Sequence, residues 1–380
     1  MKNTRQVYLD HAAATPVDRR VLVAMQPYWT ERFYNPSALY LASKQVKQDV
    51  DAARGRVAQV LGVRPTEITF CAGGTEANNI AIHGIMAQHP TGNVVVSAIE
   101  HDSVLRPAAV YAHHTVLPNE HGVILVDALS QQIDDKTVLV SIMHANNELG
   151  TIQPIKAIAE VIAQTLAKRQ QAGNDTPLYL HVDASQSANY LTIQPHKLGV
   201  DLLTINGGKI YGPKQSAALF VRSGIQLQPL VAGGGQERGL RSGTENVAAI
   251  VGIAQALEMA QAKSRHEVER LGALQRRFID GIQQIDKHAV VNGRDCLVNF
   301  VHVTFPGQDN ERLVMELDER GIQCAVGSAC SASSDEPSHV LSAIGLDAAS
   351  AQASVRFSMG RSTTEADIDY VLQALTDVLA

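Results

Sequence analysis

The sequence lacks long hydrophobic runs: none approaches the ~20 consecutive apolar residues that a membrane-spanning helix needs. The first residues, Met1-Lys-Asn-Thr-Arg-Gln6, contain no apolar segment typical of a secretory signal, so we expect no export. Cysteine is scarce too. The four residues Cys71, Cys296, Cys324 and Cys330 are scattered, which favours free thiols in a reducing cytoplasm over a disulfide framework. No pair has the Cys-x₂-Cys spacing of a zinc site, so we expect no metal.

Excess charge of one sign, internal repeats and heptads are missing as well. A net charge of −6 and a pI near 6.2 argue against a protein that binds nucleic acid. The remaining composition, 45% hydrophobic and 18% charged residues, is ordinary for a globular protein. A chain of 380 residues is too long for one small core, so we expect two domains.

Short apolar segments alternate with amphipathic ones between residues 67 and 221. The expected strands are Ile68–Phe70, Val94–Ala98, Val138–Met143, Leu178–Val182, Leu202–Asn206 and Ala218–Val221. The expected helices between them are Glu76–Gln88, Val104–His113 and Ile155–Arg169. This alternation predicts an α/β fold with a mainly parallel sheet and helices on both of its faces.

The rest of the chain follows another pattern. A glycine-rich stretch, residues 233–243, precedes a long amphipathic segment, residues 245–284, which we expect to leave the sheet domain. Strands near Val298–Phe305 and Ile322–Ala325 and a final helix, Glu365–Leu379, predict a smaller α+β domain. We therefore expect a large domain at residues 15–255 and a small domain made of residues 1–14 and 256–380.

An acid and a lysine follow two of the expected buried strands. Asp183 comes directly after one strand, and Lys209 comes shortly after the next. Ligands collect at the carboxyl ends of parallel strands. A pyridoxal phosphate (PLP) enzyme needs such a pair, because the lysine bonds to the cofactor aldehyde and the acid keeps the ring nitrogen protonated. The pair alone is better explained as an unrelated surface acid and lysine.

Polar residues follow other expected strands in the same way. Cys71-Ala-Gly-Gly-Thr-Glu76 opens a helix whose amides, with the Thr75 hydroxyl, suit a phosphate group, although a tight turn with a helix cap looks the same. His101 is suited to lie over a cofactor ring and relay protons, or to cap a helix. Asn147 and Gln186 are suited to donate hydrogen bonds to a cofactor or to cap turns.

Ten motifs in a fixed order cover nearly the whole chain, and together they are recognisable. They are Tyr8-Leu-Asp-His-Ala-Ala-Ala-Thr-Pro16, Gly73-Gly-Thr-Glu76, Glu100-His101, Asn146-Asn-Glu-Leu-Gly150, His181-Val-Asp-Ala-Ser-Gln-Ser187, Lys209-Ile-Tyr-Gly-Pro-Lys214, Gly233-Gly-Gly-Gln-Glu-Arg-Gly239, Arg241-Ser-Gly-Thr-Glu-Asn246, Gly327-Ser-Ala-Cys-Ser331 and Val355-Arg-Phe-Ser-Met-Gly-Arg361. The set resembles the group-I cysteine desulfurases of the nitrogen-fixation and iron–sulfur-cluster assembly type.

The resemblance implies a PLP-dependent transferase of fold type I with a seven-stranded sheet, acting as a cytoplasmic homodimer. Such an enzyme converts L-cysteine to L-alanine and keeps the sulfur as a persulfide for a sulfur-acceptor protein, in the biosynthesis of iron–sulfur clusters, thio-cofactors or modified tRNA. By motif position, the resemblance implies that Lys209 forms the covalent bond with PLP, that Asp183 contacts the ring nitrogen and Gln186 the phenolic oxygen, and that His101 stacks on the ring and transfers protons. It implies that Gly74 and Thr75 bind the phosphate and that Thr244 binds the phosphate of the partner subunit's cofactor. It also implies that Asn147 contacts the cofactor and the substrate, and that Arg356 binds the substrate carboxylate.

Cys330 bears on the type of reaction. Its segment, residues 327–337, is small and polar, so we expect an exposed, flexible loop. A thiolate there is suited to attack the sulfur of the substrate and to carry it to an acceptor. Without the resemblance, an incidental exposed cysteine would be the better interpretation. We expect Cys71 and Cys324 to be packed and Cys296 to lie near a turn.

The chain departs from the family pattern beside the lysine. Members usually carry a serine, then a histidine or serine directly before the lysine, and both side chains hold the phosphate; here the segment is Ile205-Asn-Gly-Gly-Lys209. Asn206 can still donate, but Gly208 has no side chain. Because a hydrogen bond to a charged group contributes ~1.5–3 kcal/mol, we expect weaker PLP binding. The backbone amides of Gly207 and Gly208 are candidates to compensate.

Two other interpretations stay open. One is another PLP-dependent reaction on the same fold, such as aminotransfer, which would not need Cys330, or selenocysteine lysis. The other is a non-catalytic sulfur-transfer partner that keeps the fold. Its only support is the altered phosphate-binding segment, and the intact Asp183, Lys209, His101 and Cys330 count against it. The sequence ends at Ala380, where cluster-assembly members continue into a tail that docks the scaffold protein, so the acceptor stays open too.

Overall fold

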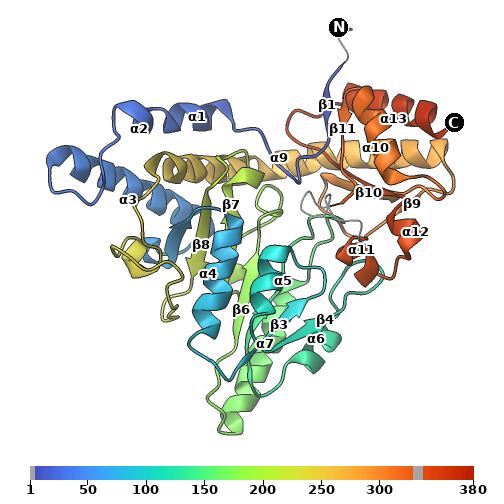
Figure 1. Cartoon of the computed structure of the whole chain (residues 1–380). Helices are drawn as coiled ribbons and strands as arrows, with labels where there is room; N and C mark the ends of the chain where they lie inside the picture. The colour runs from blue at the N-terminus through green and yellow to red at the C-terminus, as the bar shows by residue number, and fades with distance from the viewer. Residues whose placement is uncertain (1–4, 328–336) are drawn as a thin grey trace.

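The computed structural model describes residues 5–327 and 337–380, and the predicted nucleophile Cys330 lies outside them. Its main feature is a seven-stranded sheet (Figure 1). In spatial order the strands are β2 (Ile68–Cys71), β8 (Ala217–Val221), β7 (Leu202–Asn206), β6 (Tyr179–Asp183), β5 (Thr137–Ser141), β3 (Asn93–Ser97) and β4 (His113–Val116). All neighbours pair in parallel except β8, which is antiparallel to both β2 and β7.

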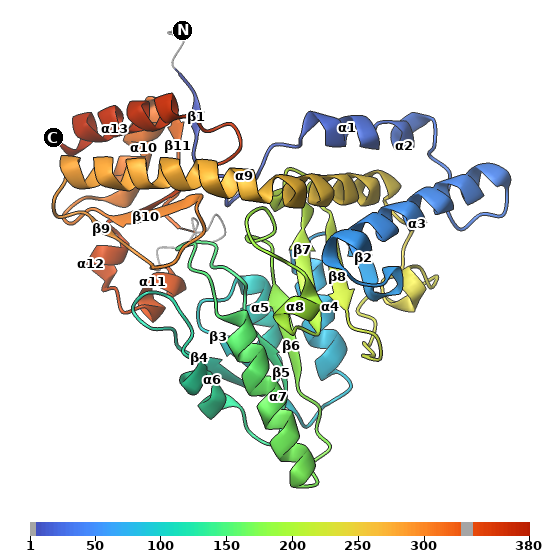
Figure 2. The same ribbon diagram turned by 180° about the vertical axis from the view of Figure 1, so that it is seen from behind.

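Helices cover both faces of this sheet, as the alternation predicted. Successive strand residues point to opposite sides, so that Val94 and Val96 pack on one face and Val95 on the other. The first face is covered by α4 (Gly74–Met86) and α5 (Asp102–Ala108). The second is covered by α3 (Leu41–Leu61), α6 (Val126–Gln132), α7 (Ile155–Gln171), α8 (Pro195–Leu198) and the first half of α9 (Val247–Ile285), as Figure 2 shows from behind.

One expected helix is partly a strand. The segment predicted as a helix to His113 ends its helix at Ala108, and His113–Val116 forms the edge strand β4. Pro107 lies in the last turn of α5 and cannot donate an amide bond to continue the helix. The edge strand pairs only with β3 and is mostly exposed, which is why it shows no buried apolar run.

A second, smaller core surrounds an antiparallel sheet of β12 (Ser354–Ser358), β10 (Phe300–Thr304) and β9 (Val290–Val291). It is an α+β unit, as predicted. Its remaining elements are β1 (Val7–Tyr8) paired with β11 (Ile322–Gln323), α10 (Asn310–Glu319), α11 (His339–Ala343), α12 (Ala348–Ala351) and α13 (Glu365–Leu379). The N-terminal helices α1 (Arg19–Met25) and α2 (Pro27–Thr30) lie against the first half of α9. Three short 3₁₀ turns are Pro65–Glu67, Gly207–Lys209 and Glu237–Gly239.

The 39-residue helix α9 connects the two cores and is roughly 58 Å long at 1.5 Å per residue. Its buried residues up to Ala260 belong to the core of the large sheet, and those from Leu271 onward belong to the second core. Figure 1 shows it running across the upper part of the molecule, below α1 and α13. Within the described residues, no helix is both long and apolar enough to cross a membrane.

Candidate active site

A cavity opens where the carboxyl ends of β5, β6 and β7 meet β12 and the N-terminal segment. It encloses about 170 Å³, which compares with the ~150 Å³ that accommodates benzene in an engineered protein core. Nine of the predicted site residues line it: Gly74, Thr75, His101, Asn147, Asp183, Gln186, Asn206, Lys209 and Arg356. Motifs scattered over the chain thus come together at one place large enough for an aromatic ring.

Asp183 ends β6, and its carboxylate is held from two sides. The backbone amide of Ser185 donates to Oδ1 at 2.8 Å, and Asn78 Nδ2 donates to Oδ2 at 2.7 Å. Asn78 is fully buried in the second turn of α4. These two bonds fix the position of the carboxylate at the cavity, where it suits the ring nitrogen of a cofactor.

His101 is both the N-cap of α5 and a wall of the cavity, so the two interpretations of this residue do not exclude each other. The backbone N–H of Ser103 donates to His101 Nδ1 at 3.0 Å, and Ser103 Oγ lies 2.8 Å from the same nitrogen. Because Nδ1 accepts from the Ser103 amide, Ser103 orients the imidazole ring against the cavity.

Lys209 ends the 3₁₀ turn that follows β7. Its Nζ donates to the carbonyl oxygens of Ala12 at 2.7 Å and Ala13 at 2.6 Å. Gln186 Nε2 donates to the same Ala12 oxygen at 3.0 Å. The N-terminal segment between β1 and α1 therefore contacts Lys209 and Gln186, two side chains that were predicted to bind the cofactor.

The N-terminus of α4 forms the other end of the cavity. A Cβ atom on Gly74 would lie 3.0 Å from Asn206 Nδ2 and 3.4 Å from Ser185 Oγ, so the glycine leaves room between these donors. Thr75 follows in the first turn of the helix and also lines the cavity. Unpaired amides and the helix dipole favour an anion at such an end. Hydroxyl groups, an amide and a helix N-terminus form a donor set that suits phosphate.

The two glycines before Lys209 do not add to this donor set. Gly208 N–H donates to Asn206 Oδ1 at 3.0 Å, which turns the Asn206 Nδ2 group toward Gly74. Gly207 N–H donates to Ser216 O at 2.8 Å. Both amides thus have acceptors within the chain, and Gly208 does not line the cavity. These contacts speak against the expectation that the glycine amides replace the missing side chains; Gly208 instead orients Asn206.

Two buried polar atoms at the cavity have no hydrogen-bond partner among the described residues. They are Arg356 Nε and Asn147 Oδ1. Arg356 is 1% exposed on β12, donates from Nη1 to the Asn147 carbonyl at 2.8 Å and is paired with Asp10. Buried polar groups are rarely left without partners, so both atoms mark places where a polar ligand would fit.

Thr244 does not line this cavity. It is exposed, in the loop before α9, and borders a second cavity together with Cys71 and Arg241. The Arg241 guanidinium pairs with Glu76 at 2.7 Å, which holds the loop beside the first turn of α4. The assignment of Thr244 to the partner subunit's phosphate stays a prediction, since one chain is described.

Burial controls the ionisation of several groups near the site. Desolvation raises the pKa of Glu100, which precedes His101, well above its ordinary value and so favours its neutral form. Burial likewise raises the pKa of Cys71 and Cys324, and that of Cys296 to about 11. The three described cysteines are therefore weak nucleophiles at neutral pH.

Sequence reasoning missed four residues of the site: Asn78, Ser103, Ser185 and Asp10. Ser103 and Ser185 each stand two positions after a predicted residue, and Asn78 stands four positions after Gly74 on the same helix, so spacing offered a signal. For Asp10 the only signal was its place in the first motif. Part of the set holds the predicted residues in place: Asn78 and Ser103 hold Asp183 and His101, and Asp10 holds Arg356.

The residues present fit PLP. A held carboxylate, a lysine amine, an imidazole and a phosphate-type donor set surround a cavity of suitable size, and two buried polar atoms await a ligand. In residues 5–327 and 337–380, no group of three or more His, Cys, Asp or Glu side chains is placed to hold a metal ion.

The chain matches the family model of class-V aminotransferases over residues 7–371. It is 41% identical to cysteine desulfurase IscS of Clostridium botulinum, with 99% of this chain and 94% of the relative covered. Identity with cysteine desulfurase IscS 1 of Archaeoglobus fulgidus is 39%, covering 98% of this chain and 96% of the relative. A solved structure described as a NifS-like protein superposes with a TM-score of 0.90 at 31% identity, covering 99% of both chains.

These matches show the family. The chain belongs to the class-V aminotransferases, whose cofactor is PLP on the type-I fold. Within that family it belongs to the cysteine desulfurases.

Proposed function

We propose that this chain removes sulfur from L-cysteine, releases L-alanine and passes the sulfur through Cys330 to an acceptor protein. The observation that carries the proposal is the convergence of Lys209, Asp183, His101 and Arg356 on one cavity. PLP, when bound, supplies an electron sink that eases removal of the Cα proton. The chain's own residues then bind the substrate, orient it and move protons.

Each side chain has a role that its contacts support. Arg356, with donors left over after its two bonds, binds the substrate carboxylate. Asp183 keeps the ring nitrogen protonated through the charge that Asn78 and Ser185 stabilise. His101 is held at Nδ1 by Ser103, and this contact orients the imidazole at the cavity for stacking and proton transfer. Lys209 exchanges its contacts with Ala12 and Ala13 for the cofactor.

Sulfur transfer requires a thiolate. In the proposed step, Cys330 attacks the substrate sulfur, an S–S bond forms, and the bond between Cβ and sulfur breaks. The electron pair stays on Cβ, which takes up a proton and becomes the methyl group of alanine; the enzyme keeps a persulfide. Burial disfavours the thiolates of Cys71, Cys296 and Cys324, which supports Cys330 as the nucleophile.

The last described residue before Cys330 also supports it as the nucleophile. Gly327 stands three residues before Cys330 in the sequence, and a Cβ atom on Gly327 would lie 3.6 Å from Glu148 Oε2. Glu148 adjoins Asn147, which lines the cavity.

The experiment is a turnover assay with PLP-loaded protein and L-cysteine, followed by mass spectrometry of free alanine and of the Cys330 peptide. We expect alanine and a persulfide of +32 Da, the mass of one sulfur atom, on Cys330, and neither with Cys330→Ser. If no alanine forms, the proposed desulfurase activity is wrong. Sulfide release that survives Cys330→Ser would instead favour another PLP reaction on this fold.

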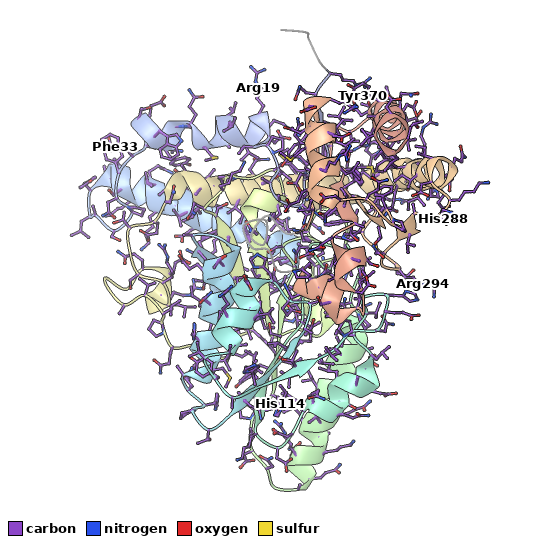
Figure 3. All side chains as sticks on the ribbon, turned by 45° about the vertical axis from the view of Figure 1, so that its right-hand side comes forward. Arg19, Phe33, His114, His288, Arg294 and Tyr370 are labelled. Atoms are coloured by element: carbon purple, nitrogen blue, oxygen red, sulfur yellow. The ribbon has the colours of Figure 1, made fainter. Side chains whose placement is uncertain are left out.

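We further propose a homodimer in the cytoplasm that serves iron–sulfur cluster assembly or a related sulfur-transfer route. Exposed apolar side chains gather in residues 22–41, where Leu22, Val23, Trp29, Phe33, Leu39 and Leu41 are 50–87% exposed. Phe33 lies at the outer edge of the molecule (Figure 3). Such a patch is typical of a protein interface. Unpaired thiols among the described cysteines support a reducing compartment.

The two cores support the proposed domains as well, with α9 passing from one to the other between Ala260 and Leu271.

The dimer is tested by light scattering of the native protein and of Phe33→Glu. A dimer that becomes a monomer in the variant supports the interface, and a native monomer contradicts it. Thr244→Ala should weaken PLP binding if Thr244 reaches the partner subunit's site.

A further inference from the structure

The guanidinium of Arg356 is almost completely enclosed yet has a counter-ion. Its side chain is 2% exposed, and Nη2 donates to Asp10 Oδ1 at 2.7 Å. Nη1 donates to the carbonyl oxygen of Asn147 at 2.8 Å, and Nε has no partner among the described residues. Of the five N–H donors of an arginine, two are used in these bonds, so others remain for a ligand in the cavity.

Asp10 is held by the same strand that carries Arg356. Ser358 stands two residues further along β12, and alternate residues of a strand share a face. The Ser358 amide donates to Leu9 O at 2.7 Å, the His11 amide donates to Ser358 O at 3.2 Å, and the Ala12 amide donates to Ser358 Oγ at 2.9 Å. Asp10 is therefore a counter-ion in a fixed place.

We propose that Asp10 is a positioning residue that sets the affinity of the site for the carboxylate of the substrate. Asp10 does not line the cavity and acts through Arg356. Without it, the buried guanidinium would lose its charge partner and its orientation, which is costly in a dry environment. With it, the plane of the guanidinium is fixed so that free N–H groups meet a second carboxylate. The inference rests on the proposed function, in which Arg356 binds that carboxylate.

The test uses two amines that differ by the carboxylate alone, L-alanine and ethylamine. Their dissociation constants are measured from the absorption change of PLP-loaded protein, so no turnover is needed. We expect Asp10→Ala to raise the dissociation constant of L-alanine about tenfold, the size of one charge-assisted hydrogen bond, and to leave that of ethylamine unchanged. Asp10→Asn keeps an acceptor oxygen and should have a smaller effect in the same direction.

Asp18→Asn is the matched control. Asp18 also pairs with an arginine of the C-terminal part, Arg361, at 3.5 Å, but lies outside the cavity. It should change neither constant. If Asp10→Ala does not fold, Asp10→Asn carries the test, with the melting temperature and the PLP affinity as checks of integrity.

Three outcomes overturn the inference: an unchanged or lower constant for L-alanine in both variants, equal changes for L-alanine and ethylamine, or a native protein that binds both amines equally. Failure of the proposed function looks different. A protein that makes no alanine from L-cysteine can still discriminate L-alanine from ethylamine through Arg356 and Asp10, and that discrimination is measured separately.

Discussion

Asp183 and His101 belong to one hydrogen-bonded chain, although 82 residues separate them in the sequence. Asn78 Nδ2 donates to Asp183 Oδ2 at 2.7 Å and to Ser103 Oγ at 2.9 Å. Ser103 in turn contacts His101 Nδ1 through its hydroxyl and its backbone amide. One buried amide on α4 therefore holds the acid that is proposed to face the ring nitrogen of the cofactor and, through Ser103, the imidazole.

Replacing Asn78 should affect both groups at once. Asn78→Ala removes a bond that stabilises the Asp183 carboxylate and leaves Ser103 without its donor. We expect the PLP dissociation constant to rise and the rate of alanine formation to fall, each by about tenfold, because hydrogen bonds to charged groups are the strong ones. Both quantities are measured on the same preparation, by absorption titration and by alanine assay.

The neighbouring Asn79→Ala serves as the control, since Asn79 Nδ2 donates to the Thr75 carbonyl on the same helix and does not touch Asp183. A double-mutant cycle with Ser103→Ala should reveal coupling between Asn78 and Ser103. Strict additivity of the two changes would show that the chain of hydrogen bonds does not act as a unit.

The sequence predicts the sheet and much of the site because each rests on local patterns. Buried parallel strands appear as short apolar runs, and candidate residues such as Asp183 and Lys209 follow their carboxyl ends, although the resemblance to a family was needed to connect the two. The edge strand β4 escaped detection because it is mostly exposed. Asn78 stands at helical spacing from Gly74, but its contact with Asp183, 105 residues away, cannot be read from the sequence, and neither can the contact of Asp10 with Arg356, 346 residues away.

The glycine pair before Lys209 shows the same limit. The sequence shows that Gly208 lacks a side chain, but the conformation of the 3₁₀ turn Gly207–Lys209 determines whether its backbone N–H can bind a phosphate group. In the structure, that amide donates to Asn206 Oδ1 and orients a donor toward Gly74. The departure from the family pattern thus has a structural consequence that residue types alone did not predict.

Gly208→Ser should strengthen PLP binding. The backbone of Gly208 does not need positive φ, and a Cβ atom there would meet Asn206 Oδ1 at 3.4 Å and Lys214 at 3.8 Å, which are ordinary contacts. A hydroxyl group at this position restores a donor that family members usually have. We expect the PLP dissociation constant to fall severalfold, by fluorescence titration, in line with one additional charge-assisted hydrogen bond.

Gly207→Ala is the contrasting variant. A Cβ atom on Gly207 would lie 2.0 Å from Ser216 Oγ and 3.1 Å from Pro213 O, so the variant should lose stability without gaining affinity. If the PLP dissociation constant of Gly208→Ser equals or exceeds that of the native protein, the phosphate group lies elsewhere.

Glu100 should make the stability of the protein decrease as pH rises. Burial raises its pKa in the folded state above the ordinary value of 4.5, so folding favours the protonated form. Its stabilising effect is complete below pH 4.5 and is lost as pH rises through the folded-state pKa. Glu100→Gln mimics the neutral acid and retains an acceptor for the Met143 amide. We expect it to exceed the native protein in stability at pH 8 and to equal it near pH 4 in denaturant titrations.

Glu67→Gln should behave in the opposite way. Burial raises the pKa of Glu67, but hydrogen bonds from Arg64 and Ser223 outweigh it and lower the pKa below 4.5. The charged form is therefore the stabilising one, present above pH 4.5 and lost as pH falls through the folded-state pKa. The variant should be less stable than the native protein at pH 8, and the difference should shrink on acidification. If the stability difference between variant and native protein changed with pH in the same direction for Glu100→Gln and Glu67→Gln, the assigned causes of the two pKa shifts would be wrong.

Thiol labelling separates Cys330 from the other three cysteines. The pKa of Cys296 is about 11, so roughly 0.1% of it is thiolate at pH 8, and burial raises the pKa of Cys71 and Cys324 as well. In native protein at pH 8, iodoacetamide should therefore modify Cys330 and leave the others intact, with little label on Cys330→Ser. Modification of Cys296 should accelerate as pH approaches 11, and all four thiols should react in denaturant. Rapid labelling of Cys71, Cys296 or Cys324 at pH 8 in the folded protein would contradict the argument for Cys330 as the nucleophile, because a second thiol would then be able to carry the sulfur.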